Sequence, residues 1–369
     1  MSSAVVGLGF GDEGKGVVVD YLCSRKPEST VLRFSGGHQA AHTVTLEDTS
    51  HVFSNFGSGT LRGCPTYWSE FCTVEPRGLW KELEVLKSKG VTPKIHIHGN
   101  CRVTTPYDIV ANWLSKERNH GTCGVGIWKT IERARRGVTI TASDVFENFQ
   151  AGNRLKEVKD YYGGLHHEDL QPMLEEFYYS VLQILGSSVQ LFTDYPRENL
   201  VFEGSQGLLL DEDLGFSPHT TPSKTNLDNL FTLGYIPSSV YLVTRAYQTR
   251  HGAGPMTNQD LPVDVQRYEE ATQYNPFQGS LRKTVLDLNL LANVVSKGMD
   301  YPDVTRHLVV TCLDQVERYK LTYNGNVMTF VDPTRFASFI GEVLKVDGSI
   351  YGNFSPRSST VRLLKTSKP

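Results

Sequence analysis

The sequence predicts an α/β fold built on a largely parallel central sheet, with phosphate-loop-like nucleotide loops and helical or loop insertions. Short apolar runs with the length of buried strands alternate with segments of helical periodicity. This alternation is typical of parallel sheets covered by helices. Loops rich in Gly, Ser, Pro and Thr follow several of the runs. Because ligands collect beyond the carboxyl ends of parallel strands, these loops are where we expect function.

Strand-like runs recur along the whole chain, at Ala4–Leu8, Val31–Phe34, Lys94–His98, Leu200–Glu203, Val240–Arg245 and His307–Leu313. Helical periodicity is clearest at Pro106–Lys116, Leu170–Leu185, Val285–Lys297 and Arg335–Leu344. The alternating histidines His96 and His98 share one face of a strand. They could bind a metal, but an ordinary half-exposed strand is the simpler interpretation.

The composition fits one large folded unit. The 369 residues are 39% hydrophobic, so we expect a single domain over residues 1–369, with a possible lobe boundary in the polar segment 148–164. A net charge of -3 argues against nucleic acid as a partner. The six cysteines lack metal-site spacing. With no signal-peptide pattern and no apolar stretch near the ~20 residues of a membrane span, we expect no membrane association and a cytoplasmic location.

The most informative segment is the loop GFGDEGKG at Gly9–Gly16, which lies between a strand-like run and a helix-like run at Val17–Cys23. It satisfies both GxGxxG and GxxxxGK, and both motifs place backbone N–H groups against phosphate. A dinucleotide site also needs an acidic residue at the end of the second strand, which here ends in Arg33-Phe34-Ser35. Lys15 instead favours contact with a terminal phosphate, although Gly16 replaces the Ser or Thr that usually holds magnesium.

Magnesium therefore needs another ligand, and Asp12 offers the hard carboxylate oxygen that this ion prefers. The alternative is that Asp12 and Glu13 only cap the helix that follows, as acidic residues near helix N-termini often do. The loop alone leaves both interpretations open.

The second strand-like run leads into RFSGGHQAAHT at Arg33–Thr43. Together with the first loop, this segment resembles the adenylosuccinate synthetase family, whose corresponding motifs read GDEGKG and GGxNAGHT. In that family the loop aspartate is the general base and a metal ligand, and the last histidine is the general acid. The resemblance implies these roles for Asp12 and His42. It also implies a Mg²⁺ site formed by Asp12 and the Ala41 backbone carbonyl.

Four later segments match the family in the family's order. The stretches GTCG at Gly121–Gly124 and ARRG at Ala134–Gly137 resemble GTTG and ARRG, which contact the nucleotide phosphate. FEGSQGLLLD at Phe202–Asp211 is similar to FEGAQGxLLD, and RHGAGP at Arg250–Pro255 is similar to the end of TRVGAGP. The resemblance is clear up to Pro255 and weaker beyond it.

The resemblance implies a set of site residues in four groups. The catalytic group is Asp12, Lys15, His42 and Gln206, with Gln206 beside the purine O6. The nucleotide substrate would contact Gln39, Thr122, Cys123, Arg135, Thr221 and Gly252. The triphosphate would contact Gly11, Glu13, Gly14, Lys15, Gly16, Thr43, Asp314, Ser355 and Pro356. L-Aspartate would contact Gly279, Ser280, Arg282 and Lys283. In the family the arginine matched by Arg135 reaches a neighbouring subunit, which implies a homodimer.

Several departures from the family bear on specificity. The family recognises the guanine of GTP with TKLD, whereas Thr311–Asp314 reads TCLD, and loss of the lysine stem favours ATP or dATP. The aspartate loop Gln278–Thr284 is shorter and less basic than the family's run of arginines. Gln39, Ala41 and Cys123 replace Asn, Gly and Thr. Substitutions at nucleotide-facing positions resemble the viral branch of the family, which acts on dGMP in the host cytoplasm. Some members of that branch lack the loop aspartate, so its presence here favours the IMP enzyme.

We therefore expect a ligase that joins L-aspartate to C6 of dGMP through a 6-phosphoryl intermediate, giving N6-succino-2-amino-2'-deoxyadenylate. The alternative is adenylosuccinate synthetase, acting on IMP with GTP. A non-catalytic nucleotide-binding protein would need the first loop but not His42 or Gln206. An NAD-dependent oxidoreductase is disfavoured by Lys15 and by the missing acidic residue.

Overall fold

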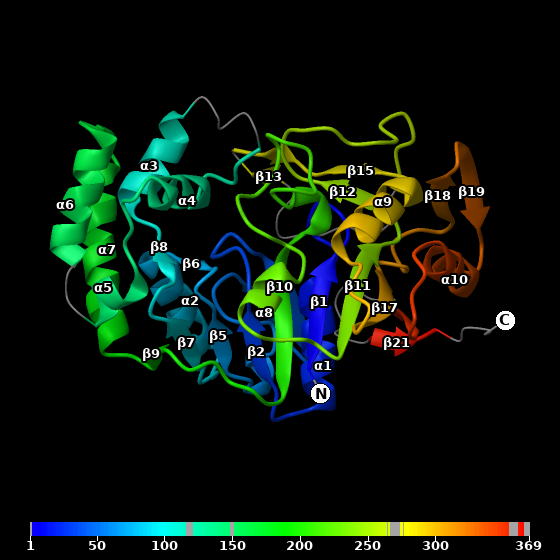
Figure 1. Cartoon of the computed structure of the whole chain (residues 1–369), viewed down its shortest axis with the longest axis horizontal. Coiled ribbons are helices and arrows are strands. Elements are labelled where there is room, and N and C mark those ends of the chain that lie inside the picture. Colours follow the sequence, from blue (N-terminus) through cyan, green and yellow to red (C-terminus); the bar gives the residue numbers. More distant parts are fainter. Residues whose placement is uncertain are drawn as a thin grey trace.

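The computed structural model describes residues 2–115, 121–147, 151–263, 265, 274–275, 277–353 and 361–364. Its centre is a ten-stranded sheet whose neighbouring strands are all parallel except the last pair, β20 and β21 (Figure 1). The predicted α/β class is therefore confirmed. The strand order is β21 (Val361–Leu363), β20 (Ile350–Asn353), β17 (Thr305–Thr311), β11 (Ser239–Arg245), β1 (Ser3–Gly7), β10 (Leu200–Gly207), β2 (Thr30–Arg33), β5 (Thr66–Trp68), β7 (Ile95–His98) and β9 (Val189–Phe192).

Each of the strand-like runs expected from the sequence is a strand of this sheet. Strand β1 shows why such runs are continuously apolar. Ala4, Val6 and Leu8 face one core, while Val5 faces another. Because helices cover both faces, neither face of the strand needs polar residues.

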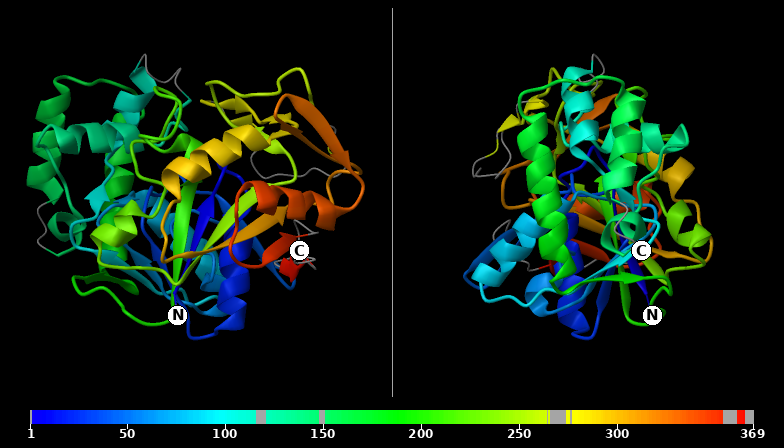
Figure 2. Two further views of the ribbon diagram at one scale, coloured as in Figure 1. Left: turned by 45° about the vertical axis from the view of Figure 1, so that its right-hand side comes forward. Right: turned by 90° about the vertical axis from the view of Figure 1, so that its left-hand side faces the viewer.

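Helices lie on both sides of the sheet (Figure 2). Helix α1 (Lys15–Arg25) packs its valines and Leu22 against one face. The opposite face is covered by α8 (Asp228–Thr232), α9 (Leu288–Gly298) and α10 (Pro333–Val343). The sheet is thus the middle of three layers.

A second core lies beyond the β5 and β7 side of the sheet, on the left of Figure 1. Its helices are α2 (Pro76–Ser88), α3 (Pro106–Leu114), α5 (Ala142–Phe146), α6 (Ala151–Tyr162) and α7 (Leu170–Leu185), and α4 (Ile127–Arg135) packs against α3 outside this core. Helix α6 occupies most of the polar segment 148–164, and its Leu155 and Val158 are buried in this core. At 151–162 that segment is therefore a packed amphipathic helix and not an extended linker.

Three of the expected helices have different limits. The helix expected at Arg335–Leu344 is α10, which begins two residues earlier at Pro333 and ends at Val343. The run expected at Val285–Lys297 begins as strand β16 (Leu286–Asp287), and α9 starts only at Leu288. The reason is local, since the Asp287 side chain accepts a hydrogen bond from the Leu290 N–H and caps the helix. Helix α3 ends at Leu114, and Lys116 lies outside the described residues.

The remaining elements are short. They are β3 (His42–Leu46), β4 (Thr49–Phe53), η1 (Thr60–Arg62), β6 (Thr73–Val74), β8 (Arg102–Val103), η3 (Leu208–Leu210), β12 (Gln248–Arg250), β13 (Tyr274–Asn275), β14 (Gly279–Ser280), β15 (Arg282–Thr284), β18 (Tyr319–Tyr323) and β19 (Asn326–Phe330). Within the described parts of the chain, no helix is long and apolar enough to cross a bilayer.

A buried ion pair joins helices α3 and α4. Arg133 on α4 donates from Nε and Nη2 to the two carboxylate oxygens of Asp108 on α3, at 2.9 and 3.0 Å. The two side chains are 1% and 0% exposed, and the Tyr162 hydroxyl donates to the same carboxylate at 2.8 Å. Removing the cation would leave a buried charge without its counter-ion.

We expect Arg133→Met to lower the free energy of unfolding by about 3–5 kcal/mol, because Asp108 stays buried without its counter-ion. Urea unfolding followed by circular dichroism measures this. The matched control is Arg136→Met at the C-cap of the same helix, since Arg136 is 64% exposed and pairs with Glu132 at the surface. Its expected cost is below about 1 kcal/mol. Equal losses in the two variants would contradict this role for the buried pair.

Candidate active site

Five loops meet at the carboxyl ends of β17, β11, β1, β10 and β2, which are consecutive in the sheet. They comprise residues 8–14, 34–41, 208–227, 246–262 and 312–314. Asp12 lies in the first of these loops. The other catalytic candidates adjoin the loops, since Lys15 begins α1, His42 begins β3 and Gln206 lies near the end of β10. Two contacts tie the loops together: Thr311 Oγ1 donates to the Glu13 carbonyl at 2.7 Å, and the Leu209 N–H donates to the Gly9 carbonyl at 3.1 Å.

The first loop wraps around its own carboxylate. Glu13 is 2% exposed, and it accepts hydrogen bonds from the Gly9 and Gly11 N–H groups at 3.0 and 2.8 Å and from Lys15 Nζ at 2.7 Å. Burial raises the pKa of Glu13, but the charge and hydrogen bond of Lys15 outweigh burial and leave the pKa below its ordinary value. These donors are the groups that a phosphate-binding loop offers to an anion.

The helix-capping alternative for this loop is wrong. The N-cap residue of α1 is Gly14 in the left-handed conformation, no side chain caps the helix, and its first turn holds no acidic residue. Asp12 also has positive φ, at 63°. Neither Asp12 nor Glu13 therefore caps helix α1.

Close packing explains why glycine follows the lysine. A Cβ at Gly16 would lie 2.7 Å from the His42 Cβ and 2.9 Å from the Ser58 Oγ. The Ser or Thr of a standard phosphate loop would collide with His42. This chain therefore lacks the hydroxyl that usually binds magnesium, and His42 packs closely against the loop instead.

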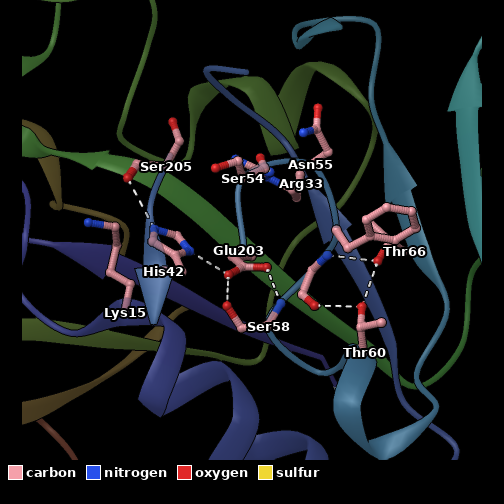
Figure 3. Close-up of polar contacts among 12 residues, drawn as sticks. Lys15, Arg33, His42, Ser54, Asn55, Ser58, Thr60, Thr66, Glu203 and Ser205 are labelled. Carbon is pink, nitrogen blue, oxygen red and sulfur yellow. Dashed lines mark hydrogen bonds and ion pairs between the residues drawn. The ribbon is translucent and has the colours of Figure 1, made fainter. Parts of the chain in front are cut away.

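His42 is held by a buried carboxylate that the sequence analysis did not single out. Its Nδ1 lies 2.6 Å from Glu203 Oε1, and its Nε2 lies 3.4 Å from the Ser205 carbonyl (Figure 3). Glu203 also accepts hydrogen bonds from the N–H and hydroxyl of Ser58. The carboxylate fixes the orientation of the imidazole. Glu203 lies inside the FEGSQG motif. The glutamate of this motif was the sequence feature from which an acidic partner for His42 could have been predicted.

Gln206 is oriented by its neighbour. The Ser205 hydroxyl donates to Gln206 Oε1 at 2.6 Å and lies 3.3 Å from the Ser35 hydroxyl. With its oxygen occupied in this way, the amide presents its NH₂ group as the free donor. A donor is what a purine 6-oxo group needs.

Asp12 lies at the tip of the first loop, with its side chain 25% exposed. Its carbonyl accepts a hydrogen bond from the Arg245 guanidinium, and its Oδ2 lies 3.3 Å from His251 Nε2. Ala41 is exposed at the end of the second loop. A partly exposed carboxylate and an accessible carbonyl are hard oxygen donors, so these residues fit a magnesium ion that keeps other positions for phosphate oxygens and water.

The described residues contain no group of three or more His, Cys, Asp and Glu side chains that could hold a metal. His96 stacks on Tyr67 with ring centres 4.3 Å apart, and His98 stacks on Tyr195 at 5.0 Å. The strand interpretation of these histidines fits these contacts.

Four of the substrate-nucleotide candidates, Thr122, Cys123, Thr221 and Gly252, lie on three loops. The Thr122 hydroxyl donates to the Asn112 side-chain Oδ1 at 3.0 Å, and burial raises the pKa of the neighbouring Cys123. A Cβ at Gly252 would lie 3.1 Å from the backbone of Gly121, so the two loops touch here. The Thr221 N–H donates to the Leu210 carbonyl at 2.7 Å.

Gln39 and Arg135 differ sharply in their surroundings. The Oε1 atom of Gln39 is buried and has no hydrogen-bond partner within the described parts of the chain. Arg135 is 60% exposed and donates to Glu212 Oε2 at 2.6 Å. Glu212 belongs to the loop after β10, so Arg135 lies at the rim of this edge.

Two arginines, the buried Arg250 and the half-buried Arg282, are paired across two strands in the predicted aspartate region. Arg250 on β12 is opposite Arg282 on β15, and Lys283 follows on the same strand. Burial and the charge of Arg282 lower the pKa of Arg250 to about 10. Arg282 donates to the Gly252 and Gly254 carbonyls at 2.6 and 3.0 Å. Facing cations of this kind favour an anionic ligand between or beside them.

The other expected ligand contacts are spread around the site. Thr43 and Asp314 are exposed, Gly279 and Ser280 form strand β14, and Ser355 and Pro356 lie outside the described residues. Cys312 has φ of 58°, which turns the TCLD segment after β17.

Glu203 should make stability depend on pH. Burial raises the pKa of Glu203, but the hydrogen bond and charge of His42 lower it below its ordinary value of 4.5. A lowered carboxyl pKa stabilises the fold above the ordinary value, and this contribution disappears as the pH falls through the folded-state pKa. We expect Glu203→Gln to be less stable at pH 7 by about 1–3 kcal/mol, with the difference shrinking below pH 4.5.

Urea unfolding of both proteins at stepped pH values tests this expectation, with Glu157→Gln as the matched control because Glu157 is 50% exposed. A difference between Glu203→Gln and the parent protein that stays constant with pH would contradict it.

The chain is similar in sequence to known proteins. The family model described as adenylosuccinate synthetase matches residues 4–321. The adenylosuccinate synthetase of Coxiella burnetii is 32% identical over 346 residues, covering 82% of this chain and 77% of that protein. That of Psychromonas ingrahamii is 34% identical over 277 residues, covering 68% of this chain and 62% of that protein.

Two solved structures share the fold. Fully ligated adenylosuccinate synthetase from Plasmodium falciparum superposes with a TM-score of 0.75 at 18% identity, covering 98% of this chain and 99% of that one. Succinoaminodeoxyadenylate synthetase of cyanophage S-2L, bound to dGMP and to dATP as an energy donor, superposes with a TM-score of 0.67 at 16% identity, covering 99% and 95%. The sequence and family-model matches show that this chain belongs to the adenylosuccinate synthetase family and is a carbon–nitrogen ligase.

Proposed function

We propose that the protein joins L-aspartate to C6 of dGMP with hydrolysis of ATP or dATP, giving N6-succino-2-amino-2'-deoxyadenylate. The observation that carries the proposal is the arrangement around one edge of the sheet. Asp12 offers a base, His42 on its Glu203 support offers an acid, and Gln206 offers an amide donor. A binding protein without chemistry needs none of these three groups.

The reaction must first convert the purine 6-oxo group into a leaving group. Asp12 takes the N1 proton, which moves negative charge onto O6. Gln206 donates its NH₂ group to O6 and orients it towards the triphosphate. The 6-oxygen then attacks the terminal phosphoryl group, and the diphosphate nucleotide leaves. The amino group of L-aspartate displaces inorganic phosphate from C6.

Cationic groups of this chain stabilise the charge that develops. Lys15 neutralises the transferring phosphoryl group, and His42 donates a hydrogen bond to it and later to the departing phosphate. Magnesium, which Asp12 and the Ala41 carbonyl would hold, supplies positive charge beside the phosphate oxygens when it is bound. Arg282 and Lys283, next to Arg250, would bind the carboxylates of L-aspartate.

The choice of dGMP with ATP or dATP rests on two observations. Cys312 stands where the family has the lysine that packs on the guanine of GTP. The cyanophage enzyme, bound to dGMP and dATP, shares this chain's fold along nearly its whole length. The second candidate is IMP with GTP, favoured by the adenylosuccinate synthetases that are 32% to 34% identical and by the presence of Asp12.

We further propose a homodimer in the cytoplasm. Arg135 is 60% exposed at the rim of the site, where a guanidinium could contact a phosphate bound by the partner subunit.

The substrate assignment is tested by a product assay with Mg²⁺ and L-aspartate, crossing dGMP and IMP with ATP, dATP and GTP. Mass spectrometry should find the succinylated product from dGMP with ATP or dATP. Product from IMP with GTP alone would replace dGMP by the second candidate. No product in any combination would overturn the ligase proposal.

Removing the base should abolish turnover without unfolding the protein. We expect Asp12→Ala to lower kcat by about 10²-fold or more, because no other group is assigned to take the N1 proton. Product formation is followed by mass spectrometry and folding by thermal unfolding. Asp213→Ala, on the loop after β10 with a 64% exposed side chain, is the control and should retain activity. Near-normal activity of folded Asp12→Ala would refute the base assignment.

A further inference from the structure

His251 is a histidine beside the catalytic aspartate that the mechanism above does not use. It follows β12, and its Nε2 lies 3.3 Å from Asp12 Oδ2. The angle between them does not make a hydrogen bond, and both ring nitrogens are buried without a hydrogen-bond partner among the described residues. Burying polar atoms without partners is unfavourable, so a native site that does so often awaits a ligand group.

The position is well defined by its neighbours. Preceding it, Arg250 is 1% exposed, donates to the Pro255 carbonyl at 2.7 Å and to the His219 carbonyl at 3.0 Å, and lies over the Phe10 ring. Following it, the Gly252 carbonyl accepts from Arg282. The backbone on both sides of His251 is therefore anchored, and the imidazole is held against the first loop.

The chemistry of 6-oxopurines suggests what the ring meets. N1–H lies next to C2, and in guanine C2 carries an amino group whose two N–H bonds lie near the N1–H. A carboxylate that receives N1–H can receive one of these amino protons, and the second needs another acceptor. In hypoxanthine the same position is a C–H group, which suits an apolar neighbour. The family motif TRVGAGP has valine where this chain has His251.

We propose that His251 is a specificity-determining residue of the purine site. One of its ring nitrogens accepts a hydrogen bond from the 2-amino group of a guanine nucleotide whose N1–H is bound by Asp12. The inference rests on the proposed function and deepens it, because it names the contact that separates a 2-aminopurine substrate from one without the amino group.

The test compares two ligands that differ only in this amino group, dGMP and 2'-deoxyinosine 5'-monophosphate. Isothermal titration calorimetry with Mg²⁺, and without aspartate or triphosphate, measures binding and needs no catalysis. The wild-type protein should bind dGMP about ten- to a hundredfold more tightly, the effect of one buried hydrogen bond. His251→Val should reduce this ratio to within about threefold while changing the affinity for the inosine nucleotide by less than about threefold.

Three further results decide the inference. His251→Asn keeps an acceptor and should retain part of the preference for dGMP. His96→Val makes the same change on distant β7 and should leave the ratio unchanged. The inference is overturned if wild type does not bind dGMP or does not prefer it, if His251→Val leaves the ratio unchanged, or if it weakens both ligands equally, which would mean that His251 only positions Asp12.

The two proposals fail separately. If the product assay yields succinylated dGMP and the binding ratio does not respond to His251, only the inference on His251 fails. If no 6-oxopurine nucleotide gives product, the proposed function fails whatever the binding ratio. The retained affinity of His251→Val for the inosine nucleotide also reports that the variant is folded.

Discussion

A buried carboxylate on the strand between β1 and β2 is the interaction on which the site depends. Glu203, on β10, binds His42, the first residue of the β3–β4 hairpin, and both the N–H and the hydroxyl of Ser58. It therefore joins the start of the hairpin to the segment that follows the hairpin. Burying a charge in this place is unfavourable unless several donors compensate it. The donors here belong to His42 and Ser58, which are both far from Glu203 in sequence, so the position of the imidazole depends on a carboxylate fixed in the central sheet. Gly16 leaves the space that this arrangement needs.

The polar atoms of the site fall into two groups. Glu13, Glu203 and Ser205 have their hydrogen bonds satisfied within the chain, and they fix the loops. Gln39 Oε1 and both ring nitrogens of His251 have no hydrogen-bond partner among the described residues, although His251 Nε2 lies 3.3 Å from Asp12 Oδ2. These unsatisfied atoms lie on loops that face the expected nucleotide. The site therefore combines a rigid internal network with a few acceptors left for a ligand, as expected of a preorganised enzyme.

The sheet could be predicted from the sequence because strands buried on both faces are continuous apolar runs, as β1 and β11 are. Shorter or mixed elements such as β5 and α2 escaped because their burial depends on tertiary contacts. The predicted start of α9 was wrong because apolar periodicity does not show that the helix begins after Asp287, its N-cap residue. In the site, Asp12, His42 and Gln206 could be expected from local motifs. The His42–Glu203 pair spans 161 positions, and the Asp12–His251 contact joins different loops, so neither follows from spacing.

The Glu13 carboxylate inside the first loop competes with any phosphate that binds there. Glu13 already occupies the Gly9 and Gly11 N–H groups and the Lys15 ammonium. A phosphate that binds to these donors must replace the Glu13 carboxylate. Binding is therefore an exchange of one anion for another. Single weak anions such as orthophosphate gain little from such an exchange. A triphosphate that makes additional contacts outside the loop can displace the carboxylate, and the loop thereby discriminates by the number of contacts a ligand makes and not by charge alone.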